Sequence, residues 1–174
     1  MSEMMIHIRP HTGSGHGAQL HCGHKIMSAV IGKNGVTHSK KEGDNATPLG
    51  LFPLVRVFYR ADRVTKPLTS LPVEALSPKD GWCDDPQSPD YNKKVILPYA
   101  AHHEKLWRED NVYDIIVVIA YNMGPAVPGR GSAIFMHLQR PTLAPTEGCV
   151  ALSQNDLLWV LSTNPQHILI HAPA

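Results

Sequence analysis

The sequence reads GSAIFMHLQRPTLAPTEGCVAL from Gly131 to Leu152. Its first part, as far as Leu138, is mostly apolar and predicts a strand that ends near His137. Cys149 follows His137 by twelve residues, after a turn-rich segment with two prolines. An imidazole at the end of a strand and a thiol after a turn are groups on which catalytic chemistry can be built.

Apolar runs predict strands on both sides of this stretch. They span Lys25–Ile31, Leu51–Tyr59, Asn111–Tyr121 and Gln166–His171. Two short helices are expected: Ala100–Glu109 has good helix formers and no Gly or Pro, and Ser153 is a suitable N-cap before an apolar run. Six prolines crowd residues 62–98, so irregular loops are expected there. The predicted fold class is mainly β, a β-rich α+β arrangement of mixed sheets.

Length and composition predict one domain over residues 1–174. Hydrophobic residues, at 43%, suffice for a core, and charged residues, at 18%, are too few for a disordered chain. Sixteen basic and fifteen acidic residues leave a net charge of +1, whereas a nucleic-acid binder needs a concentrated basic face. The longest apolar run, Ile115–Ala120, is far short of the roughly 20 residues of a membrane-spanning helix. No nucleic-acid partner and no membrane span are expected, and the oligomeric state stays open.

The segment Met1–His7 has no charged start followed by an apolar stretch and a small-residue cleavage site. No secretory signal is therefore visible. A cytoplasmic location, an atypical export route and removal of a leader all remain open.

Cysteine and histidine patterns do not predict a disulfide framework or a metal site. The three cysteines, Cys22, Cys83 and Cys149, are an odd number without CxxC spacing. The densest histidine clusters, His21–His24 and His102–His103, lack the spacing of a reliable zinc site. No metal is expected.

Cys149 and His137 admit two interpretations. A nearby imidazole and a helix N-terminus would both favour a nucleophilic thiolate. Gly148 would let backbone N–H groups approach a substrate carbonyl, as an oxyanion site requires, and the Thr146 hydroxyl could orient His137 or that carbonyl. Alternatively, Cys149 is a small buried hydrophobe, His137 a satisfied strand-end histidine and Thr146 a turn residue. Spacing alone favours this alternative.

Three short motifs change that balance. They are Thr47-Pro48-x-Gly50-x-Phe52, Gly-Ser-Ala-Ile-Phe-Met-His137 and Thr146-x-Gly148-Cys149. Together they resemble the signature of the YkuD-type L,D-transpeptidases over about residues 25–153. The resemblance implies a YkuD-like catalytic fold in bacteria, with no cofactor.

The same resemblance implies a reaction on peptidoglycan stem peptides. Cys149 would attack a carbonyl and release a D-amino acid, and an acceptor amine would resolve the thioester into a cross-link, with His137 as the base. Gly148 and Cys149 amides would hold the oxyanion. The site would be a carbapenem target, and the substrate implies the cell envelope or periplasm. An L,D-carboxypeptidase or amidase, and a non-catalytic peptidoglycan-binding module, are the alternatives.

Several positions depart from the family pattern. Leu138 replaces a glycine, Glu147 replaces a histidine, Ala151 stands where an arginine is common, and the interval between His137 and Cys149 is short. These features resemble a short, divergent member of the family. The missing arginine leaves substrate positioning unassigned.

Five residues are candidates for binding the substrate. Arg130 and Arg140 flank the strand that carries His137, and either could pair with a substrate carboxylate. Tyr121, Asn122 and Trp82 are candidate walls of a peptide groove. The alternatives are solvated loop arginines and ordinary packing beneath long loops.

Overall fold

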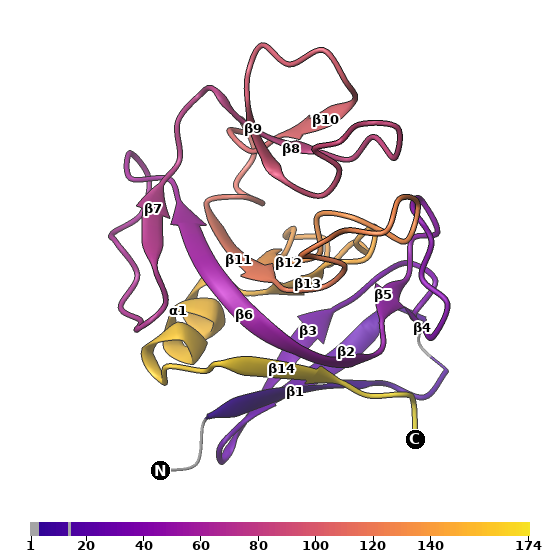
Figure 1. The fold of residues 1–174 in the computed structure, drawn as a ribbon. Helices are drawn as coiled ribbons and strands as arrows, with labels where there is room; N and C mark the ends of the chain where they lie inside the picture. Colours follow the sequence, from indigo (N-terminus) through magenta and orange to yellow (C-terminus); the bar gives the residue numbers. More distant parts are fainter. Residues whose placement is uncertain (1–3, 14) are drawn as a thin grey trace.

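A computed structural model describes residues 4–13 and 15–174 of the protein. The alternating and continuous apolar segments of the sequence form a mainly β structure (Figure 1). The main sheet has nine strands. In spatial order they are β11 (Ile115–Ile119), β12 (Phe135–Leu138), β13 (Val150–Leu152), β3 (Lys25–Val30), β2 (Gly17–Cys22), β1 (Met5–Pro10), β14 (His167–Ile170), β6 (Gly50–Tyr59) and β7 (Val73–Ala75). An additional pairing between β11 and β6 closes this sheet on itself.

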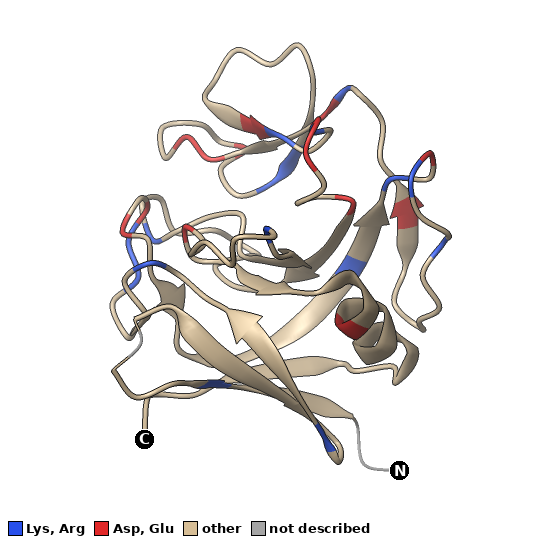
Figure 2. Cartoon of the chain, turned by 180° about the vertical axis from the view of Figure 1, so that it is seen from behind, with Lys and Arg blue, Asp and Glu red and all other residues tan. Residues whose placement is uncertain are grey.

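Two smaller sheets and a helix complete the chain. The three-stranded sheet has the order β10 (His103–Lys105), β8 (Asp80–Cys83) and β9 (Lys94–Ile96), and β4 (Val36–Thr37) pairs with β5 (Thr47–Pro48). The helix, α1 (Gln154–Ser162), lies between β13 and β14 in the chain. Figure 1 shows the β8–β10 sheet as a lobe above β11, β12 and β13. Figure 2 shows that acidic and basic residues gather on this lobe and the loops, while few lie on the strands of the main sheet.

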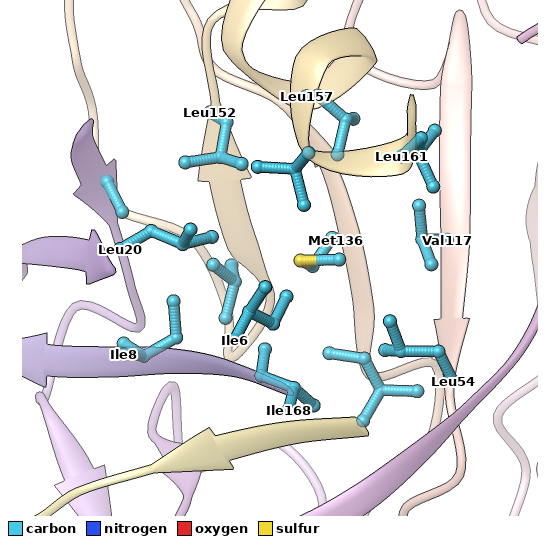
Figure 3. Close-up of a cluster of buried hydrophobic side chains, with 14 of the residues drawn as sticks. Ile6, Ile8, Leu20, Leu54, Val117, Met136, Leu152, Leu157, Leu161 and Ile168 are labelled. Carbon is cyan, nitrogen blue, oxygen red and sulfur yellow. The ribbon is translucent and has the colours of Figure 1, made fainter. Parts of the chain in front are cut away.

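The main core lies inside the closed sheet and is covered by α1 (Figure 3). In β1 and β2, alternate residues such as Ile6, Ile8 and Leu20 point inward and are fully buried, as the two-residue period of a strand requires. From α1, Leu157 and Leu161 meet them on the inner side. Full burial of such a side chain contributes about 1.5–3 kcal/mol.

A second core separates the main sheet from the lobe. β11 is buried on both faces: Val117 belongs to the main core, whereas Ile116 belongs to the second. In β12, Met136 faces the main core and Phe135 the second one. Strand alternation therefore directs His137 to the same side as Phe135, towards the lobe.

The mainly β class with mixed sheets is confirmed, and the expected helix that starts after Ser153 is present. The helix expected over Ala100–Glu109 is wrong. In its place β10 pairs antiparallel with β8, with Glu104 opposite Trp82, and Leu106 is fully buried in the second core. Tertiary pairing and burial outweigh helix propensity there. The described residues therefore hold one helix rather than two.

Three further expectations can be compared with the structure. The proline-rich residues 62–98 contain loops, but also the short strands β7, β8 and β9. Of the segment inspected for a secretory signal, residues 1–3 lie outside the described residues, and β1 begins at Met5. Within the described ranges, no helix is long and apolar enough to cross a membrane.

Candidate active site

A cavity of about 650 Å³ lies where the main sheet meets the β8–β10 lobe. Five residues that the sequence predicts for the site line it: His137, Arg140, Thr146, Gly148 and Cys149. The other four predicted residues, Trp82, Tyr121, Asn122 and Arg130, are not part of its lining. The fold thus brings the cysteine and the histidine to one cavity.

Cys149 is held by two backbone groups from the segment that leads into β12. Its thiol donates to the carbonyl oxygen of Ala133 at 3.2 Å, and the N–H of Phe135 donates to Sγ at 3.4 Å. Only 8% of the residue is exposed. Burial raises the pKa of the thiol to about 12, with the charges of Glu104 and Glu147 acting in the same direction and the Phe135 N–H opposing them. The resting thiol is therefore neutral at pH 7.

His137 presents an unprotonated nitrogen. Its Nδ1 lies 3.0 Å from the carbonyl oxygen of Leu138, and because a carbonyl only accepts, Nδ1 carries the proton and Nε2 keeps its lone pair. Burial lowers the pKa of His137 to about 4, and the positive charges of Arg108 and Arg140 lower it further, against the Leu138 carbonyl. Both members of the pair are thus neutral at pH 7.

Thr146 and Gly148 shape the turn before the cysteine. The Thr146 hydroxyl donates to the carbonyl oxygen of Cys149 at 2.6 Å and accepts the N–H of Gly148 at 3.1 Å. Gly148 has φ +142°, and a Cβ at this position would lie 2.8 Å from the carbonyl oxygen of Ala46. Thr146 therefore turns the chain rather than orienting His137. The Gly148 amide, expected as an oxyanion donor, already has a partner.

Contrary to expectation, the helix N-terminus does not adjoin Cys149. β13 separates Cys149 from α1 in the chain. Ser153 caps that helix by accepting the N–H of Asp156 at 3.2 Å, which confirms the predicted N-cap. Since the field of a helix end falls off within about one turn, α1 does not offset the burial that raises the pKa of the thiol.

A family model described as the L,D-transpeptidase catalytic domain, YkuD, matches residues 22–170. The chain belongs to the YkuD family. The resemblance inferred from the sequence motifs is confirmed. No curated protein matches the sequence. Among solved structures, L,D-transpeptidase 1 of Mycobacterium tuberculosis is similar over 96% of this chain and 62% of its own, with 12% identity and a TM-score of 0.39.

In this YkuD domain, two arginines lie near the position where the family arginine is missing. Ala151 pairs with His137 across β12 and β13, and both line the cavity. Arg140 and Arg108 line the same cavity. Both contact Asp110: Arg108 donates from Nε and Nη2 at 2.8 and 2.7 Å, and Arg140 donates from Nη1 at 3.4 Å. Two guanidinium groups share one carboxylate, so this group of three side chains carries a net positive charge.

Sequence analysis did not identify Arg108. It lies in the segment assigned to a helix, and its pairing with Asp110, two residues on, is common on protein surfaces. Its guanidinium packs against the Tyr113 ring, 5.3 Å from the centroid, and both residues line the cavity.

The remaining candidates serve the structure around the cavity. The buried Trp82 packs edge-on against Phe135, with ring centroids 5.0 Å apart, and its Nε1 donates to Asn92. The Asn122 side chain bonds backbone groups of Val127 and Gly131 and so orders the loop after β11.

Tyr121 and Arg130 belong to the same loop region. The Tyr121 hydroxyl donates to the carbonyl oxygen of Arg130 at 2.6 Å. The Arg130 side chain is exposed, outside the cavity lining. These placements match the alternatives given above: Tyr121 serves the packing of the loop region, and Arg130 is a solvated loop residue.

Sequence analysis did not anticipate that several acidic residues line the cavity. Glu42, Asp84, Glu104 and Glu147 line it, accompanied by Lys40 and His102. Glu42 accepts hydrogen bonds from Tyr91 at 2.7 Å and Ser132 at 2.5 Å, which joins the loop before β5 to the lobe. These carboxylates come from four separate segments, so no local sequence pattern predicts that they lie in one cavity. Among the described residues, no group of three or more His, Cys, Asp or Glu could hold a metal ion.

Proposed function

We propose that this chain is a cysteine-dependent acyltransferase that acts on peptidoglycan stem peptides as an L,D-transpeptidase. One observation carries the proposal: a reduced Cys149 and a neutral His137 with a free Nε2 line one cavity in a YkuD-family domain. A binding module has no evident use for a thiol beside a base, so catalysis is favoured over binding alone.

The protonation states of the pair suggest the order of events. A pKa of about 12 for the thiol and about 4 for the imidazole opposes a preformed thiolate–imidazolium pair. Proton transfer from Sγ to Nε2 of His137 therefore accompanies attack on the carbonyl. His137 then returns the proton to the departing amine of the D-amino acid, and a thioester remains on Cys149. An amine of a second stem peptide displaces the sulfur and forms the cross-link.

The developing oxyanion needs N–H donors that are not already used. Because Thr146 accepts the Gly148 amide, the Cys149 amide is the better candidate of the two that the sequence suggests. The same turn keeps Gly148 without a side chain at the cavity wall, where a substrate carbonyl can approach.

Arg140 and Arg108 are proposed to replace the missing family arginine. Their shared Asp110 leaves one positive charge uncompensated, next to His137. A substrate carboxylate can bind there through charge-assisted hydrogen bonds. The substrate also motivates a proposed location in the cell envelope.

Incubation with purified muropeptides, followed by mass spectrometry, tests the function. Cross-linked dimers with release of a D-amino acid support transpeptidation. Shortened stem peptides alone would instead indicate an L,D-carboxypeptidase, in which water resolves the thioester. Unchanged muropeptides that nevertheless bind would indicate a binding module.

A further inference from the structure

Glu104 is a carboxylate of the cavity wall that the mechanism above does not use. It lies on β10, and its backbone is fixed by the pairing of β10 with β8. The Tyr113 hydroxyl donates to its Oε1 at 2.9 Å. Among the residues that the structure describes, no other hydrogen bond to this carboxylate is found, and the side chain faces the cavity.

Tyr113 connects Glu104 to the catalytic pair. Its ring packs edge-on against the His137 ring, with centroids 5.4 Å apart, while its hydroxyl holds Glu104. Glu104 also pairs in register with Trp82, and the Trp82 ring packs against Phe135. The backbone N–H of Phe135 in turn contacts the Cys149 sulfur. Glu104 is therefore held in a fixed position relative to both the base and the nucleophile.

The surroundings favour a carboxyl group that exchanges a proton near neutral pH. Burial raises the pKa of Glu104 to about 7, against the hydrogen bond from Tyr113, and the negative charges of Asp84 and Glu147 raise it further, while Arg108 opposes them. These groups face Glu104 from the β8 side, the loop before β13 and the segment after β10. A base whose pKa lies near the working pH transfers protons most effectively.

We propose that Glu104 is the base of the second half-reaction, in which it takes a proton from the amine or water that attacks the Cys149 thioester. This role rests on the proposed function. An acceptor amine enters as an ammonium ion and gives one proton to the Glu104 carboxylate. Its nitrogen then forms the new C–N bond as the C–S bond breaks, the second proton passes to the leaving sulfur, and Glu104 releases its proton to solvent. When water is the acceptor, a C–O bond forms in place of the C–N bond, and the proton on Glu104 passes to the leaving sulfur.

His137 is less suited to this step. It ends the first half-reaction neutral and able to accept a proton, but burial and the positive charges of Arg108 and Arg140 keep its pKa low, so it is the weaker base. An arriving ammonium ion is repelled by these arginines and attracted to the carboxylates of Glu104, Asp84 and Glu147, which line the same cavity. The carboxylates near Glu104 therefore suit an ammonium ion better than the surroundings of His137 do.

Glu104→Gln tests the proposal, because it removes the charge and keeps an oxygen for the Tyr113 hydroxyl. The substrate is a synthetic stem tetrapeptide with a terminal D-alanine, with and without a second stem peptide as acceptor. We expect a burst of one D-alanine per enzyme, a thioester adduct that persists in the intact-protein mass, and steady-state turnover lower by about a hundredfold. The burst rate should stay close to that of the wild type.

Two variants accompany it. Glu109→Gln removes an exposed carboxylate five residues away, outside the cavity lining, and should match the wild type in both phases. Glu104→Asp keeps the carboxylate and should restore part of the lost turnover, with a shifted pH dependence of the second phase.

Unchanged turnover in Glu104→Gln would overturn the role and leave the proposed function intact. Equal slowing of the burst and of turnover, without recovery in Glu104→Asp, would assign Glu104 to structure and also overturn it. A wild-type protein that forms no thioester would overturn the proposed function together with this role.

Discussion

The thiol of Cys149 donates to the carbonyl oxygen of Ala133, with 3.2 Å between sulfur and oxygen. The resting thiol is therefore bonded to the backbone beside β12. Ala133 has φ +53° and its N–H donates to Asn92 Oδ1 at 3.0 Å, so a buried asparagine fixes the residue that accepts from this thiol. In the proposed mechanism, the thiol proton must pass from the Ala133 carbonyl to His137 for attack to begin.

Replacement of Cys149 by alanine should abolish turnover and leave the fold intact, because it removes the nucleophile and little volume. Activity on muropeptides and the thermal unfolding midpoint measure the two effects. Cys22→Ala and Cys83→Ala are the matched controls: both thiols are buried outside the cavity lining, so activity should persist at a small cost in stability. Substantial product from Cys149→Ala would refute the nucleophile assignment.

A carbapenem should acylate Cys149, because a thiol activated by a base can open a strained lactam and remain as a thioester. Intact-protein mass spectrometry should show one adduct on the wild type and none on Cys149→Ala. A wild-type mass that stays unmodified after long exposure would contradict an activated thiol.

Acylation should tolerate acid better than an ordinary histidine-dependent reaction. His137 acts as a base only when neutral, and burial lowers its pKa from 6.5 to about 4. The rate of adduct formation should hold as pH falls through 6.5 and decline near pH 4, where the imidazole becomes protonated. Stopped-flow measurement of acylation from pH 3.5 to 8 gives the profile, and a midpoint near 6.5 would show that His137 titrates normally.

Arg140→Ala should weaken substrate capture more than chemistry, because this guanidinium lines the cavity beside His137. We expect KM for a stem peptide to rise by about tenfold, the loss of one charge-assisted contact of about 1.5 kcal/mol, with a smaller change in kcat. Arg130→Ala is the control, since Arg130 is exposed outside the lining. Equal effects of the two variants would exclude a specific role for Arg140.

Asn92→Ala should destabilise the protein and slow acylation. The Asn92 side chain accepts from Trp82 and Ala133 and donates to the carbonyl oxygens of Tyr121 and Asn122. Its loss leaves several buried groups unpaired, at about 1–3 kcal/mol for each. Urea denaturation should show a loss of about 2–4 kcal/mol. A change below about 0.5 kcal/mol, typical of surface sites, would show that water replaces these contacts.

The sequence by itself determined the features that depend on local pattern. Val and Ile runs predicted β11, the residues after Ser153 predicted α1, and the motifs around His137 and Cys149 identified the family. These features can be predicted from the sequence because strand burial, helix capping and a short turn before a cysteine depend on neighbours in the chain.

Only the tertiary structure decided the composition of the cavity. Residues 100–109 have helix propensity, yet pairing with β8 makes part of them a strand and places Glu104 in the lining of the cavity that holds Cys149 and His137. Arg108, whose guanidinium packs on the Tyr113 ring, lines the cavity, whereas Trp82 packs against Phe135 outside the lining. Each of these placements depends on contacts between segments far apart in the chain, whose free energy exceeds the local preferences of the residues involved.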